Sequence, residues 1–208
     1  MARTFDDATR RNIAELCAAF TRLAPAEPVP TLKRAAVAIA LTEADNGKDT
    51  AFLLTRRSAS LRAHSAQWAL PGGRCDAGET RAQAALRELH EELGLALGER
   101  DVLGLLDDYP TRSGYLITPV VVWADPNAAI TPNPDEVASV HRIPLDAIED
   151  DAFTFVTIPE STRRVIRFRL GGQQIHAPTA ALIYQFREVL AGRNTRVADL
   201  EQPVFAWK

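Results

Sequence analysis

The chain has 208 residues, of which 46% are hydrophobic and 25% charged; this suits one globular domain with decorated ends and excludes a largely disordered chain. The 24 Lys and Arg and 27 Asp and Glu leave a formal net charge of −3, which excludes a strongly basic nucleic-acid-binding protein. Two cysteines, Cys17 and Cys75, are too few for a disulfide framework or a Cys-rich zinc site, so we expect free thiols in a reducing compartment.

The first residues lead into no apolar stretch, and no segment approaches the roughly 20 apolar residues of a membrane span. We therefore expect a soluble, cytoplasmic protein without a membrane partner.

The N-terminal part predicts a helix, a connector and a β-hairpin. Apolar residues at helical spacing predict a helix over residues 6–23, and three prolines between residues 25 and 30 make the following segment an extended connector. A buried strand over 35–41, a turn at Asn46-Gly47 and a returning strand over 51–55 predict the hairpin.

Further along, strands alternate with two helices. One helix is predicted over residues 80–93 and ends at Gly94; the other is predicted over 178–190, with Pro178 at its first position and Gly192 just beyond it. Strands are predicted over residues 102–106, 116–123, 137–142, 153–158 and 165–170. This mixture indicates an α/β or α+β fold.

The helix over residues 80–93 carries three carboxylates on one face. At 100° per residue, Glu91 and Glu92 fall at about 300° and about 40° from Glu88. Like charges at these spacings destabilise a helix by about 0.2–0.5 kcal/mol per pair, and Arg87 is the only cation within the cluster. A solvated acidic face is one interpretation. The other is a site for Mg²⁺ or Mn²⁺, which prefer carboxylate oxygens.

The spacing around this helix favours the second interpretation. The stretch fits G-x5-E-x7-R-E-U-x-E-E-x-G-U, where U is a bulky aliphatic residue and the fixed positions are Gly73, Glu79, Arg87, Glu88, Leu89, Glu91, Glu92, Gly94 and Leu95. This stretch, hereafter the box, resembles the signature of Nudix hydrolases, a strong match because nine positions agree at fixed spacing.

The resemblance implies an α/β/α sandwich with a mixed central sheet and hydrolysis of a nucleoside diphosphate linked to another moiety. It implies Mg²⁺ or Mn²⁺ bound by Glu88, Glu91, Glu92 and the backbone carbonyl of Gly73. Arg87 and Glu79 are expected to pair and orient these ligands. We place the catalytic machinery on Glu88, Glu91, Glu92, Arg87 and Glu136. Glu136 is a candidate further metal ligand or general base, and a plain loop acid is its alternative.

The segment before the box indicates a substrate. Leu53-Leu54-Thr55, Arg57-Ser58, Arg62 and Leu70-Pro71-Gly72-Gly73 resemble the pattern of coenzyme A pyrophosphatases within the same superfamily, as do Thr111–Gly114 and Thr118-Pro119. Ala66 and Leu70 replace the Gly and Phe of that pattern. We expect Arg57, Arg62, Ser58 and Gly72 to contact substrate, because guanidinium groups match phosphate oxygens; surface ion pairs are the alternative for the two arginines.

Three hypotheses follow for the function. The first is hydrolysis of coenzyme A or acyl-CoA to 3′,5′-ADP and (acyl-)4′-phosphopantetheine. The second keeps the chemistry but takes ADP-ribose, a dinucleotide or a nucleoside triphosphate. The third is a sensor that binds a nucleotide without turnover, which the complete box argues against.

We divide the chain into an N-terminal helix and connector (1–30), a Nudix domain (31–192) and a C-terminal tail (193–208). The N-terminal helix and the tail, with Val204, Phe205 and Trp207, either form a homodimer contact or pack on their own domain, so we expect a monomer or homodimer. The expected partner is a small phosphorylated substrate and not a nucleic acid.

Overall fold

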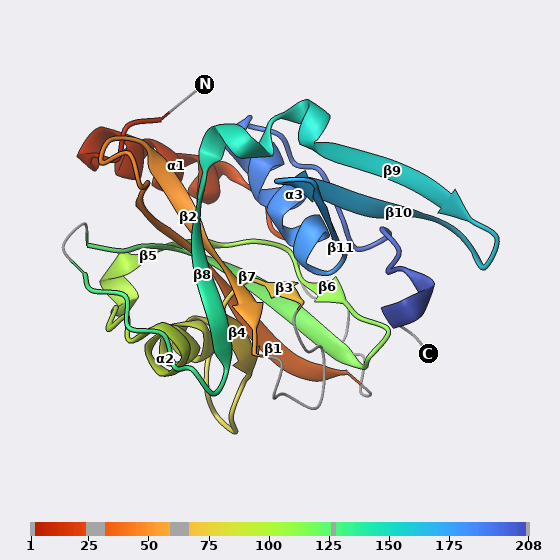
Figure 1. The fold of residues 1–208 in the computed structure, drawn as a ribbon, viewed down its shortest axis with the longest axis horizontal. Coiled ribbons are helices and arrows are strands. Elements are labelled where there is room, and N and C mark those ends of the chain that lie inside the picture. The colour runs from red at the N-terminus through yellow and green to blue at the C-terminus, as the bar shows by residue number, and fades with distance from the viewer. Residues whose placement is uncertain (1–2, 24–31, 59–66, 126–127, 207–208) are drawn as a thin grey trace.

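A computed structural model describes residues 3–23, 32–58, 67–125 and 128–206 (Figure 1). Their centre is a mixed eight-stranded sheet. Its strands are β1 (Lys33–Glu43), β2 (Thr50–Arg57), β3 (Trp68–Ala69), β4 (Gly72–Arg74), β5 (Val102–Leu105), β6 (Tyr109–Pro110), β7 (Tyr115–Trp123) and β8 (Val137–Pro144).

Five strands of this sheet lie side by side in the order β3-β2-β1-β7-β5. Of the remaining three, β4 pairs with β1, β6 with β7 and β8 with β2. β1 and β7 run parallel over the whole of β7, from Lys33 opposite Tyr115 to Leu41 opposite Trp123. The other pairings in this sheet are antiparallel, including the predicted hairpin of β1 and β2.

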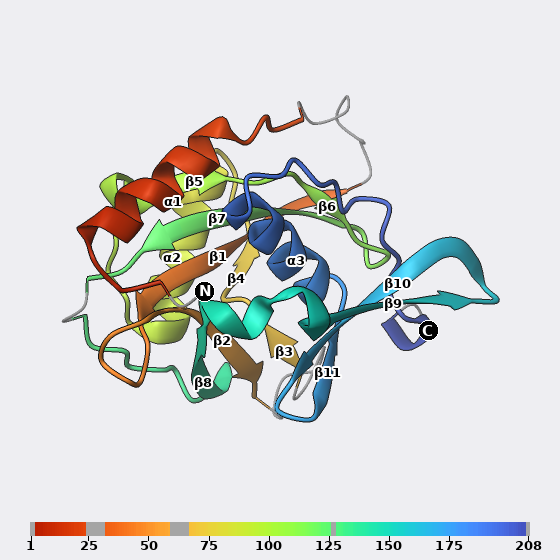
Figure 2. The same ribbon diagram turned by 90° about the horizontal axis from the view of Figure 1, so that it is seen from above.

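Side chains of β1 alternate between two cores, as expected for a central strand. The small residues Ala36, Ala38 and Ala40 belong to the core under helix α2 (Arg81–Leu93), whereas Ile39 and Leu41 belong to the opposite core. Helices α1 (Asp7–Ala19) and α3 (Thr179–Leu190) cover that opposite face (Figure 2). The predicted α/β/α architecture is therefore confirmed.

A second sheet lies beside α3. It contains β9 (Phe153–Ile158), β10 (Ser161–Leu170) and β11 (Gln173–His176), all antiparallel, and the β9–β10 hairpin projects away from the central sheet (Figures 1 and 2). Short 3₁₀ turns complete the described elements at Glu99–Asp101, Leu145–Ile148, Asp150–Ala152 and Val204–Ala206. No α-helix in the described ranges is long and apolar enough to span a membrane.

The first helix ends at Ala19, so the prediction that it continues to residue 23 is wrong. Phe20 turns into the core with an extended backbone. The next free backbone N–H groups then bind side chains: Thr21 donates to Asn194 Oδ1 at 3.0 Å and Leu23 to Asp107 Oδ1 at 2.7 Å. Tertiary partners thus replace the helical hydrogen bonds.

The other helices fall close to their predicted bounds. α2 begins one residue later than predicted, with Thr80 as its N-cap, and α3 begins at Thr179, with Pro178 one position before it. β10 begins at Ser161, earlier than predicted, because the hairpin with β9 continues to Ile158. The short strands β3, β4, β6 and β11 were not predicted.

The segment after α3 packs on its own chain. Val197, Leu200 and Glu201 are buried, while Phe205 is 63% exposed and its ring contacts His176 edge-on. α1 likewise buries Ile13 and Cys17 in the core shared with α3. Trp207 lies outside the described residues, and the oligomeric state stays a prediction.

A buried ion pair fixes this segment. Glu201 is 2% exposed and accepts hydrogen bonds from Arg112 Nε at 3.1 Å and Nη2 at 2.6 Å, and from the Ser161 hydroxyl at 2.9 Å. The Arg112 guanidinium lowers the pKa of the Glu201 carboxyl to about 2. One carboxylate thus joins the β6–β7 turn, the β9–β10 hairpin and the segment after α3.

We expect Glu201 to make folding stability depend on pH. Its folded pKa lies below its ordinary value of 4.5, so its contribution is complete above that value and is lost as the pH falls toward about 2. Denaturant unfolding at several pH values should show the wild type losing more stability over this window than Glu201→Gln. Equal losses in both proteins would contradict this role.

Candidate functional site

Helix α2 carries the candidate site and has well-formed ends. The Thr80 hydroxyl accepts from the Gln83 N–H and the Gln83 side chain accepts from the Thr80 N–H, which makes a capping box. At the other end Gly94 adopts φ 70°, a left-handed conformation suited to glycine. Leu86, Leu89 and Leu93 are buried beneath the sheet, so the carboxylate face is held in a fixed direction.

Arg87 lies at the centre of the site. Its Nε and Nη2 donate to Glu79 at 3.0 and 3.2 Å, and its Nη1 donates to Glu88 and Glu91 at 2.9 Å each. Nη2 also donates to the backbone carbonyl of Arg74 at 2.9 Å. These contacts lower the pKa of Glu79 and raise that of Arg87. The Arg87 guanidinium therefore orients both the loop before α2 and the carboxylates of Glu88 and Glu91 on α2.

The three glutamates of the face differ in exposure. The side chains of Glu92 and Glu88 are 5% and 14% exposed, whereas that of Glu91 is 50% exposed. Burial, followed by the nearby Glu88 carboxylate, raises the pKa of Glu92 to about 7, and burial also raises the pKa of Glu88. The interpretation of a solvated acidic face therefore does not hold for Glu92 or Glu88, whose side chains are mostly buried.

The two glycines of β4 make close approaches possible. The Gly72 N–H donates to Glu92 Oε2 at 3.2 Å, so this predicted substrate contact already has a partner within the protein. A Cβ at Gly73 would lie 2.3 Å from Glu88 Oε1, while a Cβ at Gly72 would lie 2.3 Å from the Ala36 carbonyl oxygen. Gly73 thus leaves room for a carboxylate and Gly72 for the backbone of β1.

Glu136 and Arg57 also lie at this cluster. The Glu136 carboxylate is near enough to raise the pKa of both Glu88 and Glu92. Arg57 Nη1 is 3.9 Å from Glu92 Oε1, and its buried Nε has no hydrogen-bond partner among the described residues. The Ser58 N–H donates to the Glu136 carbonyl at 2.8 Å, which brings the end of β2 beside Glu136.

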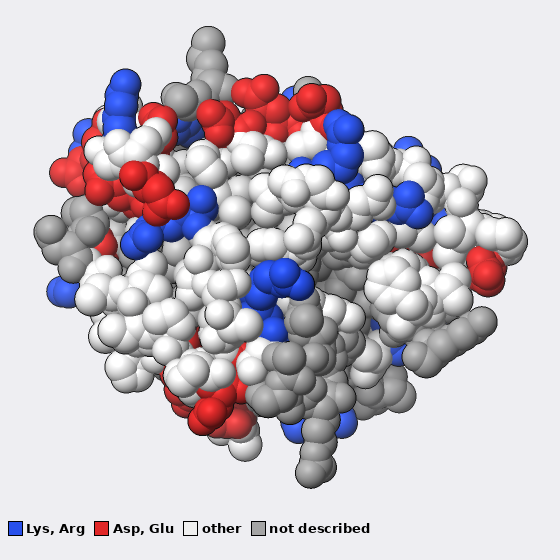
Figure 3. Space-filling model, viewed as in Figure 1, with Lys and Arg blue, Asp and Glu red and all other residues white. Residues whose placement is uncertain are grey.

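Arg62 and Ala66 lie outside the described residues, so the structure does not place that part of the predicted substrate site. Of the other predicted positions, it brings Glu79, Glu88, Glu91 and Arg87 into direct contact and Glu92, Arg57 and Gly72 into a second group beside them. In Figure 3, acidic side chains gather near α2 and the lower end of β8, and Lys and Arg are scattered over this face without forming one patch.

A cleft of about 450 Å³ opens beside this group. Arg57, Gly72, Gly73 and Arg74 line it on the side of the box, and α3, the β6–β7 turn (Thr111–Gly114) and Gln202 line it elsewhere. Gln202 could not be predicted as a lining residue, because a single glutamine in a polar segment carries no signal. Thr111–Gly114 was noted only as part of the coenzyme A pyrophosphatase resemblance.

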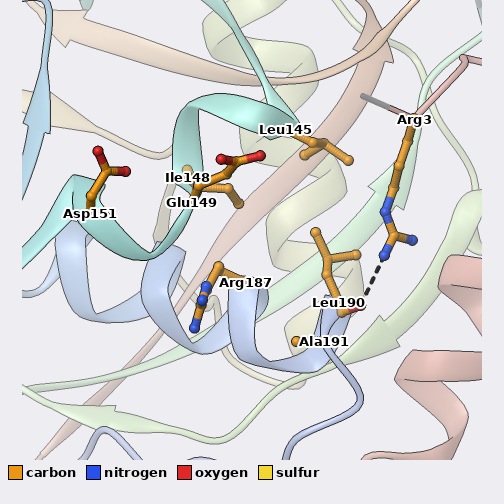
Figure 4. Close-up of a pocket in the computed structure, with 8 residues that line it drawn as sticks. All are labelled: Arg3, Leu145, Ile148, Glu149, Asp151, Arg187, Leu190 and Ala191. Atoms are coloured by element: carbon orange, nitrogen blue, oxygen red, sulfur yellow. Dashed lines mark hydrogen bonds between the residues drawn. The ribbon is translucent and has the colours of Figure 1, made fainter. Parts of the chain in front are cut away.

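A separate cavity of about 390 Å³ lies between the turn Leu145–Ile148 and α3 (Figure 4). Arg3 and Arg187 line it together with Glu149 and Asp151, and Arg3 Nη2 donates to the Leu190 carbonyl at 2.9 Å. It contains none of the predicted site residues.

The carboxylate cluster suits a hard cation that also binds a ligand. In the described ranges, no three His, Cys, Asp or Glu side chains are grouped so that they alone could hold a metal ion. Mg²⁺ keeps several waters and is commonly held by one or two carboxylates plus substrate phosphates, so a closed cage is not required. Repulsion from Glu88 contributes to the raised pKa of Glu92, and a divalent cation held by these carboxylates would relieve it.

Gly73→Ala should weaken divalent-cation binding with little loss of stability. The added methyl group would displace the Glu88 carboxylate, whose end is flexible, whereas Gly72→Ala meets backbone at φ 151° and should destabilise the fold by about 1–3 kcal/mol. Calorimetric titration with Mn²⁺ and thermal unfolding separate the two effects. Gly98→Ala, whose methyl group meets only Asp101 at 4.0 Å, is the control. Wild-type Mn²⁺ affinity in Gly73→Ala would contradict this reading.

Comparisons with known proteins identify the family. The NUDIX domain profile matches residues 32–161. The uncharacterized Nudix hydrolase NudL of Photorhabdus laumondii is 35% identical over 141 residues, 66% of this chain and 75% of that protein. NudL of Pectobacterium atrosepticum is 36% identical over 148 residues, 68% of this chain and 76% of that protein.

Solved structures agree in fold. A Nudix hydrolase of M. smegmatis, RenU, matches with a TM-score of 0.51 and 25% identity over 76% of this chain and 86% of that one. A MutT/nudix family protein of Enterococcus faecalis shares the fold with a TM-score of 0.55 at 16% identity, over 90% and 79% of the two chains. Nudix hydrolases generally use divalent metal ions. This chain belongs to the Nudix family and is a pyrophosphohydrolase.

Proposed function

We propose that the protein hydrolyses coenzyme A or acyl-CoA to 3′,5′-ADP and (acyl-)4′-phosphopantetheine with Mg²⁺ or Mn²⁺. The observation that carries this proposal is the position of Arg57. It comes from the segment that resembles coenzyme A pyrophosphatases, and its guanidinium lies both at the carboxylate cluster and in the wall of the cleft.

In this proposal Glu88, Glu91, Glu92 and the Gly73 carbonyl hold the cation, and Arg87 with Glu79 positions them. A bound divalent cation would polarise the phosphoryl oxygens and lower the pKa of an attacking water. Glu136 would serve as a further ligand or as the general base, which its place beside Glu88 and Glu92 supports.

The reaction is a hydrolysis of a phosphoric anhydride. The oxygen of water forms a bond to one phosphorus, the bond from that phosphorus to the bridging oxygen breaks, and the proton of the water leaves to a base. Arg57 and Arg62 would bind phosphate oxygens as the bridge breaks, and Ser58 and Gly72 would border the substrate.

A second hollow supports a substrate with an additional phosphate. It measures about 440 Å³ and lies at the start of α2. Four cations line it, Lys33, Arg34, Arg74 and Arg81, together with two acids, Asp76 and Glu79, of which Glu79 is paired with Arg87. Arg74 also lines the cleft, so the two spaces are neighbours. Coenzyme A carries a 3′-phosphate beyond its diphosphate, and guanidinium groups are suited to bind it.

The substrate proposal is tested by a panel of coenzyme A, acetyl-CoA, dephospho-CoA, ADP-ribose and NADH with Mg²⁺ or Mn²⁺. Product release should give the highest kcat/KM for the two CoA compounds. Glu91→Gln and Glu92→Gln should each lower kcat by about 100-fold or more, because each removes an anionic oxygen ligand, while Glu15→Gln on the exposed side of α1 should not. A higher kcat/KM for ADP-ribose would overturn the substrate, and unaltered kcat in both glutamine variants would overturn the site.

Arg87→Lys should lower kcat by about 10–100-fold while the protein stays folded. An ammonium group keeps the charge but cannot reproduce the guanidinium contacts to Glu79, Glu88, Glu91 and the Arg74 carbonyl. The measurement is steady-state kinetics beside thermal unfolding. An unchanged kcat would show that the charge of Arg87 suffices and its geometry does not matter.

A further inference from the structure

The two sides of the cleft differ in charge. The cations that line it, Arg57 and Arg74, lie on the side of the box, next to Gly72 and Gly73. Along the rest of the described lining every side chain is uncharged, and no Asp or Glu lines the cleft. A charged group would therefore find no counterion on the side formed by α3, the β6–β7 turn and Gln202.

This neutral side combines apolar surface with hydroxyl groups. Ile117, Pro178 and Leu182 supply apolar surface. The Thr111 hydroxyl is already engaged, because it accepts from the Tyr115 N–H at 2.9 Å and lies 3.1 Å from the Ser113 hydroxyl. A ligand group here must therefore be uncharged and partly apolar.

Gln202 supplies a buried polar group on this side of the cleft. Its side chain is 4% exposed and lines the cleft. The Arg112 backbone N–H donates to Gln202 Oε1 at 2.5 Å; since a backbone N–H can only donate, this contact fixes the oxygen and turns the NH₂ group elsewhere. Among the described residues that NH₂ group has no acceptor.

The surroundings hold this amide in place. Gln202 follows Glu201, whose carboxylate accepts from the Gln202 N–H at 3.0 Å and from the Arg112 guanidinium. The side-chain oxygen of Gln202 and, through Glu201, its backbone N–H are therefore both tied to the β6–β7 turn before any ligand binds. A donor fixed in advance loses little entropy on binding and selects for an acceptor.

We propose that this neutral side is a subsite for an uncharged, amide-bearing arm of the substrate, whose carbonyl oxygen accepts a hydrogen bond from Gln202 Nε2. The proposal rests on the function proposed above and assigns the pantetheine half, and not the nucleoside half, to this side of the cleft. Gln202 is a specificity-determining residue and takes no part in bond breaking.

Two aromatic rings line the cleft among the described residues, those of Trp68 and Tyr115, and the Trp68 ring already has partners. Trp68 is approached by the Arg56 guanidinium at 5.5 Å from its ring centroid and by the His141 ring at 4.7 Å. Its Nε1 donates to Gln173 at 2.8 Å, so its polar atom is also used. An aliphatic chain with amide groups matches the apolar and neutral polar lining of this side.

The test uses the two halves of the substrate separately, so that no turnover is needed. Binding of 4′-phosphopantetheine and of 3′,5′-ADP is measured by calorimetry with Mg²⁺ present for the wild type, Gln202→Glu and Gln202→Met. Gln202→Glu keeps the oxygen that accepts from Arg112 and replaces only the NH₂ group with an acceptor. Gln174→Glu adds the same charge to exposed β11, away from the cleft.

We expect Gln202→Glu and Gln202→Met to weaken 4′-phosphopantetheine binding by about tenfold and to leave 3′,5′-ADP binding unchanged, as a lost hydrogen bond predicts. Gln174→Glu should alter neither. In kinetics with coenzyme A, KM should rise and kcat should stay near the wild-type value.

Loss of 3′,5′-ADP binding alone would assign the nucleoside to this side and overturn the proposal, as would unchanged binding of both halves. Failure of the wild type to bind 4′-phosphopantetheine would overturn it too. If the wild type binds 4′-phosphopantetheine through Gln202 but does not hydrolyse coenzyme A, the proposed function fails and the subsite stands. Thermal unfolding of each variant confirms that the comparison is made between folded proteins.

Discussion

The guanidinium of Arg87 is the interaction on which the candidate site depends. Without it, the carboxylates of Glu79, Glu88 and Glu91 would repel one another across less than two turns of helix and the loop before it. Its planar group meets three carboxylates and a backbone carbonyl at once, which a lysine cannot do. By neutralising these carboxylates, Arg87 therefore fixes the loop before α2, the carboxylate face of α2 and the position of β4.

Much of the fold could be predicted because local signals and tertiary contacts agree. The capping residues Thr80 and Gly94 bound α2, and Asn46-Gly47 joins β1 to β2. The end of α1 was misplaced because side chains far along the chain, Asn194 and Asp107, satisfy its following N–H groups. Contacts of this range leave no local pattern.

The residues of the candidate site could be predicted from the sequence, but the burial and contacts of their side chains could not. Fixed spacing identified the glutamates of the box, yet helical periodicity placed Glu91 and Glu92 on one face without showing that Glu92 is buried and Glu91 exposed. That difference comes from the packing of β4 and Arg57 against one side of the helix. Gln202 was missed because its orientation depends on an Arg112 N–H that lies 90 residues away in sequence.

Val197 and Leu200 are buried in the same core as α1 and α3, and Gln202 follows them in the wall of the cleft, which has a consequence for biosynthesis. These residues leave the ribosome after every other described element that lines the cleft, so a nascent chain already holds the complete box while one wall of its cleft is missing. The parallel pairing of β1 with β7 also joins distant segments, which slows folding relative to a chain of local contacts. The carboxylate cluster can therefore assemble before the chain acquires the wall that would discriminate among substrates.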